Sequence, residues 1–431
     1  MKNSLSLFQK SVILLIIVAI PLMRTGVADF LFGDDTAYFR DALFCPLGSI
    51  VKPYAGYVQI LCRTAASLCL RLPDDWAVSM FMIAPIISLG ITAAIILNLK
   101  WLDPSFRAIL ALSTVILPHS SEVYSHLCNC NWTASLLTCV FLFQPSLGGL
   151  REKRTVFTSF ITALLGLSSI YVALLSPLYG LRFLKLKRKT SGEVVLLSVI
   201  VITSAIQTLT VISSGLTMSS TNDAAPAFAP IFSPLVTFIN AIFILPVASY
   251  VTSVELLQKA VHNIRLFIPT ALLICAMCLS ILYLWWTSEK QAKKQALMFF
   301  GIGYYLIIAC AARTANALQL YIPMRGADRY FFLPYVFFTI ALSFIVAIRN
   351  GSRTRRLISY LVVMVLAAFY ISEWTITRAP EASREIWFKQ LDKLHRTGSW
   401  DFNPRNGVYM PTSTAEDTPN TDAQSARPGD I

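Results

Sequence analysis

Two adjacent carboxylates, Asp34 and Asp35, lie directly beyond the first apolar segment of the chain. One of them could act as a general base that takes the proton from an attacking hydroxyl. The other could orient that hydroxyl or help to hold a divalent cation through its oxygens. The structural alternative is a solvated loop in which an Asp caps a helix that begins near Thr36. The pattern by itself leaves both interpretations open.

A second group of candidate residues combines aromatic rings with cations shortly after the Asp pair. Tyr38 and Arg40 follow within one or two helical turns, and we expect Tyr38 to line an acceptor site. Tyrosine rings flanking small residues could form a wall that faces a sugar or a lipid, although an aromatic belt at a membrane interface has the same composition. The further residues of this group are Lys52, Tyr54, Tyr57 and Arg63.

A third candidate group is the polar segment at residues 119–131, which contains Glu122 and His126. Their spacing of four residues places both on one face if the segment is helical. Together with Asn131 and Trp132, these side chains suit sugar hydroxyls and sugar ring faces. Two close ligands are too few to indicate a zinc site, so no metal is assigned to them.

The fourth group gathers cations late in the chain, at Arg313, Arg325 and Arg329, with Tyr330 beside them. Arginine binds phosphate through its planar fork of donors, so this cluster could hold the phosphate of a substrate. The alternative is that Arg329 pairs with Asp328 or with an Asp of the first loop. Both interpretations are compatible, because a phosphate site near carboxylates needs balancing positive charge.

The composition indicates what must position these residues. The chain has 431 residues, of which 55% are hydrophobic and 14% charged, with a mean hydropathy of +0.62. Soluble proteins carry about 25% charged residues. The net charge of +13 is concentrated in short clusters between long apolar segments, which is typical of a membrane protein and argues against nucleic-acid binding.

The apolar segments predict an all-α, polytopic transmembrane bundle of about eleven spans at residues 1–372. Each segment can cross a hydrocarbon core as a helix of about 20 residues, with shorter helices packed against protein. The interval 155–184 is bounded by basic clusters and is predicted to cross twice, with a bend near Ser168 and Ser169. The predicted spans lie at residues 11–23, 76–98, 106–118, from 132 to before 151, twice in 155–184, and at 194–214, 266–286, 296–312, 331–348 and 357–371.

The basic clusters orient this bundle, because Lys and Arg concentrate in cytoplasmic loops. They predict a cytoplasmic N-terminus and an outer C-terminus. The candidate residues then fall on the outer side, where residues 24–75 form a first loop with an amphipathic, interfacial helix at 54–72. Residues 215–265 form an outer region whose apolar part, 231–251, is re-entrant or spans as a pair. A soluble tail follows at 373–410, and residues 411–431 are predicted to be disordered.

Nine cysteines are scattered along the chain without zinc-site spacing. Cys45, Cys128 and Cys130 fall in the predicted outer loops, so a disulfide among them is possible. The other six are predicted to be small apolar residues within helices.

Taken together, these features resemble the GT-C class of membrane glycosyltransferases, in particular bacterial enzymes that modify O-antigen or other surface glycans. The resemblance rests on the predicted topology and on Asp34 and Asp35, which fall where that class places its catalytic acid. It implies transfer of a sugar from a polyprenyl-phosphate donor to a glycan or lipid acceptor on the outer face of a bacterial inner membrane. It implies no cofactor beyond a divalent cation at the Asp pair.

A flippase or transporter for a lipid-linked glycan, and an O-antigen polymerase-like protein, are the alternatives. A transporter predicts functional charges near the middle of the membrane. A polymerase would also use outer arginines. The sequence names neither the sugar nor the acceptor.

Overall fold

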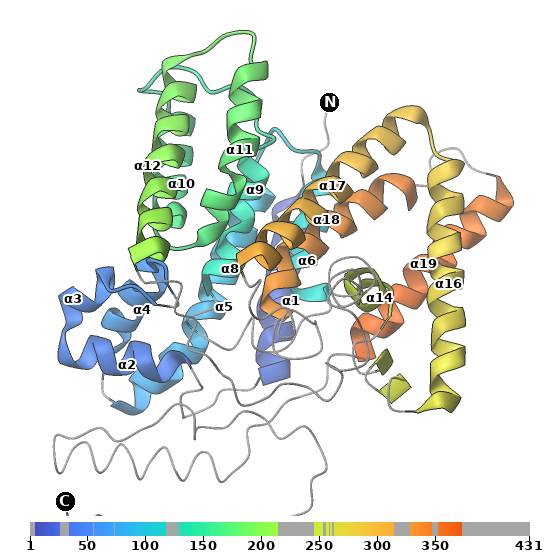
Figure 1. Cartoon of the computed structure of the whole chain (residues 1–431), viewed down its shortest axis with the longest axis horizontal. Helices are drawn as coiled ribbons and strands as arrows, with labels where there is room; N and C mark the ends of the chain where they lie inside the picture. The colour runs from blue at the N-terminus through green and yellow to red at the C-terminus, as the bar shows by residue number, and fades with distance from the viewer. Residues whose placement is uncertain are drawn as a thin grey trace, which may run out of the picture.

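A computed structural model describes most of the predicted bundle (Figure 1). Among its described residues the regular secondary structure is helical, apart from one isolated bridge between Tyr54 and Tyr57, and turns and irregular segments connect the helices. The side chains of a few residues within the described ranges, Asp34 among them, are outside the description. The described residues are 5–25, 34–54, 56–72, 74–117, 127, 130–213, 245–252, 256–257, 259–260, 263–313, 328–346 and 352–372.

A helix or a pair of consecutive helices occupies each of the eleven predicted ranges. The fourth range is divided between two short helices, α8 and α9. The helices are α1 (Leu7–Thr25), α5 (Asp74–Asn98), α6 (Pro104–Ile116), α8 (Cys130–Ala134), α9 (Leu136–Phe141), α10 (Lys153–Gly166), α11 (Ile170–Lys185), α12 (Ser191–Ser213), α16 (Ile264–Trp286), α17 (Lys290–Arg313), α18 (Asp328–Val346) and α19 (Arg353–Ser372).

Three of the described helices are long and apolar enough to cross a membrane, judged by length and composition. They are the segments Ser79–Asn98, Ser191–Ser213 and Arg265–Trp286. This indicates membrane association. The count of eleven spans and their orientation stay predictions, because several of the other helices are shorter or carry charges in their first turn.

The first loop differs from the prediction of one amphipathic helix at 54–72. Three short helices form instead, namely α2 (Asp34–Phe44), α3 (Pro46–Val51) and α4 (Ile60–Cys69). Residues 52–59 cannot continue α4, because Gly56 has a φ of 81° and closes a tight turn. Arg63 on α4 is buried, so this helix packs against protein and does not lie with its cation in an interface.

Other predicted regions fall largely outside the described residues. In the outer region 215–265, helix α14 (Leu245–Val251) is described together with a few residues after it. Most of residues 231–251 are not described, so whether this part spans or re-enters stays a prediction. The tail at 373–431 lies outside the described residues.

The predicted bend at Ser168 and Ser169 is confirmed as a break between α10 and α11. Ser169 has extended backbone angles and caps α11, its hydroxyl accepting a hydrogen bond from the Tyr171 amide at 3.2 Å. Two adjacent serines compete for backbone groups and so favour a helix end over a helix interior. The break leaves backbone carbonyls free to accept hydrogen bonds from other parts of the chain.

Other helices attach at this break. The Ile60 amide donates to the Leu167 carbonyl at 3.1 Å, and the Leu61 amide donates to the Ser168 hydroxyl at 2.9 Å. The Asn131 side chain of α8 donates to the Ser168 carbonyl at 2.9 Å. The start of α4 and the start of α8 are thereby held against the turn between α10 and α11.

At the end of helices α11 and α12 that lies away from the break, a buried ion pair connects the two helices. The Arg182 guanidinium donates two hydrogen bonds to the Glu193 carboxylate, at 2.5 and 2.7 Å. The carboxylate also accepts from the Leu147 amide at 2.7 Å. Glu193 is 1% exposed, so its charge is tolerated because three donors replace water.

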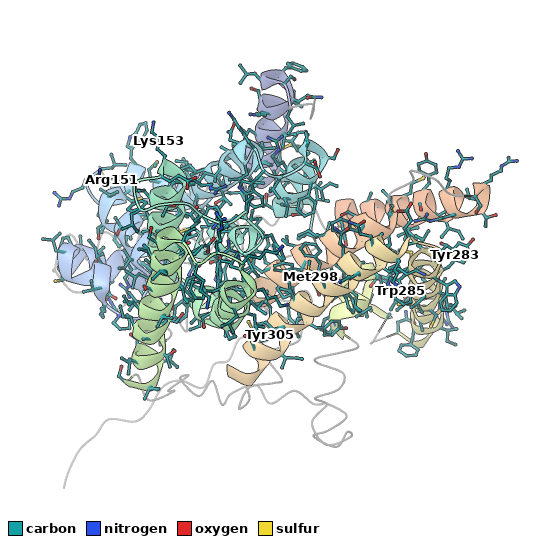
Figure 2. All side chains as sticks on the ribbon, turned by 90° about the horizontal axis from the view of Figure 1, so that it is seen from above. Arg151, Lys153, Tyr283, Trp285, Met298 and Tyr305 are labelled. Atoms are coloured by element: carbon teal, nitrogen blue, oxygen red, sulfur yellow. The ribbon has the colours of Figure 1, made fainter. Side chains whose placement is uncertain are left out.

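The second half of the chain packs onto the first through aromatic and polar contacts. The rings of Phe106 on α6 and Phe344 on α18 have centroids 5.9 Å apart, and Phe299 on α17 stacks on Phe344 at 5.6 Å. Tyr305, labelled in Figure 2, donates its hydroxyl to the Leu174 carbonyl of α11 at 2.6 Å. These contacts join α17 and α18 to the bundle of α5, α6 and α11.

Helix ends that carry basic clusters lie together. Lys10 on α1 donates to Asn98 at the end of α5 at 2.6 Å, and the Gly192 amide at the start of α12 donates to the Gly148 carbonyl at 3.0 Å. We call this side of the molecule, which carries Lys10, Lys100 and the basic residues at 151–154 and 185–189, the basic end. In Figure 1, helices α2–α4 lie at the opposite end of α10–α12 from the connection between α11 and α12.

Gly192 allows this close approach, and it provides a test of the fold. A Cβ there would lie 2.5 Å from the Gly148 carbonyl oxygen, whereas a Cβ at Gly180 on α11 would meet nothing within 4 Å. We expect Gly192→Ala to lower the free energy of unfolding by about 1–3 kcal/mol through overpacking. Gly180→Ala should be neutral or stabilise by up to about 1 kcal/mol. Thermal unfolding in detergent compares the two, and equal effects would contradict this packing.

Candidate functional site

The three helices α2, α3 and α4, with the turn at residues 52–59, form a compact unit that we call the cap. Pro46 begins α3, where its missing amide is not needed. The turn is closed by backbone hydrogen bonds between Tyr54 and Tyr57, at 3.0 and 3.2 Å. Its geometry directs the tyrosines of the turn and the buried face of α4 toward α2.

A buried carboxylate, Asp41, lies at the centre of the cap. Its Oδ2 accepts from Arg63 Nη1 at 3.0 Å, and its Oδ1 accepts from Lys52 Nζ at 2.7 Å. Arg40 is further away, with Nη2 at 3.6 Å from Oδ1. The Asp41 side chain is 8% exposed and that of Arg63 1%, whereas that of Lys52 is 54% exposed. Of the two cations that bond to Asp41, Arg63 therefore lies in the interior of the cap and Lys52 at its surface.

These contacts set the charge state of Asp41. Burial acts to raise the pKa of its carboxyl, but the hydrogen bonds and positive charges of Lys52 and Arg63 outweigh burial and hold the pKa below the usual value of 3.8. Asp41 is therefore an anion across the neutral range and serves to neutralise the two cations.

Two tyrosine rings that contact each other lie beside the Arg63 guanidinium. Its carbon lies 4.7 Å from the centre of the Tyr38 ring and 6.0 Å from that of Tyr54, and the two rings are 5.0 Å apart. The negative faces of aromatic rings attract cations at such distances. The Tyr38 hydroxyl donates to the Gln59 side-chain oxygen. The ring beside Tyr54 is thus Tyr38. The wall of Tyr54 and Tyr57 facing a sugar or lipid stays a prediction.

Arg63 also keeps unused hydrogen-bonding capacity. Its Nε and Nη2 have no hydrogen-bond partner among the described residues, although the side chain is almost completely buried. A guanidinium has five donors in a fixed plane, and a buried donor without an acceptor carries a desolvation penalty. An anion bound beside Arg63 would supply the acceptors.

The predicted Asp pair is described in part. Asp34 begins α2, but its side chain lies outside the described residues. Asp35 is 1% exposed, and its Oδ2 accepts a hydrogen bond from the Leu127 amide at 2.9 Å. Asp35 thereby holds Leu127 against α2.

The two buried thiols of the cap, Cys62 and Cys69, are not activated nucleophiles. Burial, with the Asp35 carboxylate nearby, raises the pKa of the Cys69 thiol to about 11. Burial and the neighbouring Cys130 raise the pKa of Cys62 well above its usual value. No group of three or more His, Cys, Asp or Glu side chains that could hold a metal ion occurs in the described part of the chain.

The cap brings together about half of the residues predicted to form a site. Arg40 lies on α2 with its side chain 43% exposed and directed at Asp41. Tyr57 is buried beside Val58 in the turn. The gathered residues are Asp35, Tyr38, Arg40, Lys52, Tyr54, Tyr57 and Arg63.

The other predicted residues remain untested. Glu122, His126 and Arg325 lie outside the described residues. The divalent cation predicted at Asp34 and Asp35 is untested too, because the side chain of Asp34 is not described. The backbones of Arg313 in α17, and of Arg329 and Tyr330 in α18, are described, but their side chains are not. Their grouping with the cap stays a prediction.

Two residues of the cap were missed by the sequence reasoning. Asp41 lies three residues after Tyr38, a spacing that puts both on one helix face, and it stands near several cations. That pattern could have identified it. Gln59 carries no such signal, because its role depends on the turn that brings it to Tyr38.

The structure thus defines a helical protein of membrane character with a polar, cation-containing cap at one end. No protein-family model, no curated protein and no solved structure matches this chain. Its function is therefore inferred from the site.

Asp41 gives a testable link between charge and stability. Because its pKa is lower when folded than unfolded, it contributes stability that is present above the unfolded value of 3.8 and lost as the pH falls through the folded pKa. We expect Asp41→Asn to lower the free energy of unfolding at pH 7 by about 3 kcal/mol, since Arg63 stays buried without its counter-charge.

Thermal unfolding of both proteins in detergent between pH 7 and pH 3 measures this effect. The difference in unfolding temperature between wild type and the Asp41→Asn variant should narrow below pH 3.8. Arg71→Gln, at an exposed position at the end of the cap, is the control. A difference that is constant with pH would contradict the ion-pair assignment.

The cysteines provide a test of the contact between the cap and α8. Cys62 and Cys130 are buried with their Sγ atoms 3.4 Å apart, whereas Cys45 is exposed and unpaired. A disulfide needs the sulfurs at about 2 Å. We expect maleimide to label Cys45 in the folded protein and to leave Cys62 and Cys130 unlabelled, because burial makes these two thiols inaccessible, with both results read by peptide mass spectrometry. A bond between Cys45 and Cys130, one of the pairings considered from sequence, would contradict the structure.

Proposed function

We propose that this chain is a membrane glycosyltransferase that moves a sugar from a polyprenyl-phosphate donor to a glycan or lipid acceptor at the cap. The observation that carries the proposal is the buried Arg63 guanidinium, with two donor atoms unused, which lies beside the Tyr38 ring and beside Asp41. A phosphate would complete the hydrogen bonding of this arginine.

The donor would bind with its phosphate on the cationic side of the cap. Arg63 supplies planar donors that match phosphate oxygens, and Lys52 supplies a mobile charge at the surface. Tyr38 and Tyr54 supply ring faces against which a sugar can pack. We retain Arg325 and Arg329 as further contacts to the donor phosphate, as predicted from sequence.

The reaction needs a base near the donor. In the proposed step the acceptor hydroxyl attacks the anomeric carbon, the bond from that carbon to the phosphate oxygen breaks, and the polyprenyl phosphate leaves with the electron pair. A carboxylate takes the hydroxyl proton. We assign this role to Asp34, because the Asp35 carboxylate is already engaged by the Leu127 amide and so orients the loop.

The proposed placement is a bacterial inner membrane, with the bundle crossing about eleven times, the N-terminus cytoplasmic and the cap outside. The grouping of basic helix ends away from the cap supports it, because cytoplasmic loops carry an excess of Lys and Arg. An outer site requires a lipid-linked donor, since nucleotide sugars are cytoplasmic.

A flippase or transporter for a lipid-linked glycan is the second candidate. One observation favours it. The described carboxylates of the cap, Asp35 and Asp41, are both engaged by other groups of the protein. Such a cap could hold a phosphate without transferring the sugar.

Substitution of the acids tests the proposed enzyme. We expect Asp34→Asn to lower transfer at least about 100-fold, because general-base catalysis is lost. Asp35→Asn should lower transfer too, through a displaced loop. Transfer is measured with membranes, a polyprenyl-phosphate sugar and mass spectrometry of the surface glycan. Full activity of both variants at normal expression would overturn the enzyme assignment.

The phosphate role is tested separately with Arg63→Lys, which keeps the charge and loses the planar fork. We expect weaker donor binding by roughly tenfold, or about 1.4 kcal/mol, with Arg71→Gln unchanged. Thermal unfolding verifies that each variant is folded. In a deletion strain, loss of one side-chain sugar supports transfer, whereas shortened chains support the polymerase-like alternative.

A further inference from the structure

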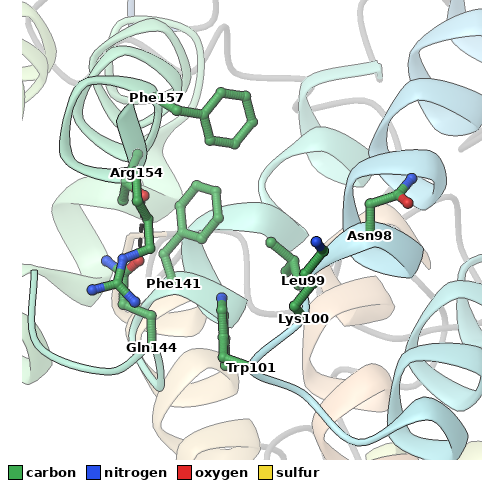
Figure 3. Close-up of a pocket in the computed structure, with 9 residues that line it drawn as sticks. Asn98, Leu99, Lys100, Trp101, Phe141, Gln144, Arg154 and Phe157 are labelled. Carbon is green, nitrogen blue, oxygen red and sulfur yellow. Dashed lines mark hydrogen bonds between the residues drawn. The ribbon is translucent and has the colours of Figure 1, made fainter. Parts of the chain in front are cut away.

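A second polar site lies at the basic end and shares no residue with the cap. A cavity of about 480 Å³ opens between the end of α5, the connection to α6, the end of α9 and the start of α10 (Figure 3). The residues that matter for its chemistry are Lys100, Trp101, Phe141, Gln144, Arg154 and Phe157.

The lining of this cavity is positively charged. Lys100 and Arg154 contribute two cations, and none of the described residues that line it is a carboxylate. Lys100 has no ion-pair partner among the described residues and is exposed. Arg154 donates from Nη2 to the Ser146 carbonyl at 2.6 Å, and its Nε is 3.5 Å from the Glu152 carboxylate. Glu152 therefore balances one cation in part, and the positive charge of Lys100 remains.

Gln144 adds a buried donor to the same cavity. Its side-chain oxygen accepts from the Thr158 hydroxyl at 3.2 Å, which fixes the amide orientation. The Nε2 group then has no partner among the described residues, although Gln144 is 5% exposed. In Figure 3, Gln144 and Arg154 lie on one wall, and Lys100 comes from the connection after α5. An occupant with anionic oxygens would satisfy this amide.

The surroundings indicate that this occupant also has an apolar part. Trp101, Phe141 and Phe157 supply aromatic surface to the cavity. On α10, Phe157 is 41% exposed, Val156 57% and Phe160 64%. This apolar face begins at the cavity mouth and suits hydrocarbon chains that run along the helix.

We propose that this cavity binds the phosphate of an anionic phospholipid headgroup, with the acyl chains along the exposed face of α10. Lys100, Arg154 and the Gln144 amide hold the phosphate oxygens, and the aromatic residues contact the glycerol region. Basic pockets between helices at a membrane surface are suited to such headgroups. The inference is independent of the function proposed for the cap.

The test uses the full chain purified in detergent, with lipid binding followed by native mass spectrometry. Phosphatidylglycerol is the probe, and phosphatidylcholine is the comparison lipid. We expect the double variant Lys100→Gln, Arg154→Gln to bind phosphatidylglycerol at least about tenfold more weakly, because two charge-assisted contacts are lost. Gln144→Leu should weaken binding without any change of charge.

The matched control removes the same charge nearby. Arg151 and Lys153 are exposed, do not line the cavity and are labelled in Figure 2. The double variant Arg151→Gln, Lys153→Gln should bind phosphatidylglycerol within about twofold of wild type, since surface charges contribute little to a specific site. Equal losses in the two double variants would show general attraction to the surface and overturn the site.

A soluble phosphate is separated from a lipid by competition. Glycerol 3-phosphate shares the phosphate and lacks the chains, so we expect it to displace phosphatidylglycerol only at a far higher concentration. Equal affinity for both would overturn the lipid assignment. Lys100→Arg keeps the charge and should retain binding, and thermal unfolding of each variant separates a lost site from a lost fold. Loss of binding in a folded Lys100→Arg variant would also count against the proposal.

Discussion

The arrangement of this protein depends on one interruption in its backbone hydrogen bonding, the break between α10 and α11. In an apolar environment a free carbonyl or amide is costly, so the break persists because other segments satisfy it. The Ile60 amide and the Asn131 side chain donate to carbonyls at the break, and the Leu61 amide donates to the Ser168 hydroxyl. Gln207 adds a further connection, donating from α12 to the carbonyls of Val58 and Gly166 at 3.0 and 2.9 Å. One helix end thereby fixes where the cap stands.

At both ends of helices α10–α12, a buried charge is compensated by an opposite charge beside it. At the basic end, Glu193 is fully compensated by Arg182 and a backbone amide. In the cap, Asp41 compensates Arg63 and Lys52, but two donor atoms of Arg63 remain unused. A completed ion pair is a structural element, whereas a buried guanidinium with free donors is suited to a ligand. This difference separates the candidate site from the remaining polar interior.

The two proposed sites would recognise the same chemical group in different settings. In the cap, phosphate would meet an arginine beside aromatic rings and beside acids that could take a proton. At the basic end, phosphate would meet Lys100 and Arg154, with no carboxylate among the described lining residues, beside an exposed apolar helix face. The first setting is suited to a reaction on a lipid-linked sugar, and the second to holding a lipid of the surrounding bilayer. Charge alone would not distinguish them.

The sequence by itself determined the helical class, the positions of the helices outside the first loop and the break at Ser168 and Ser169, because apolar length and local serine chemistry act over a few residues. It also selected Tyr38, Tyr54 and Arg63 as candidates from their types. Only the tertiary structure decided that Arg63 is buried, that Asp41 and Gln59 belong with it, and that Asp35 is engaged by Leu127. Those facts depend on contacts between segments up to 92 residues apart, which no local pattern encodes. The turn at Gly56 and the packing of α4 against α10 and α8 created them.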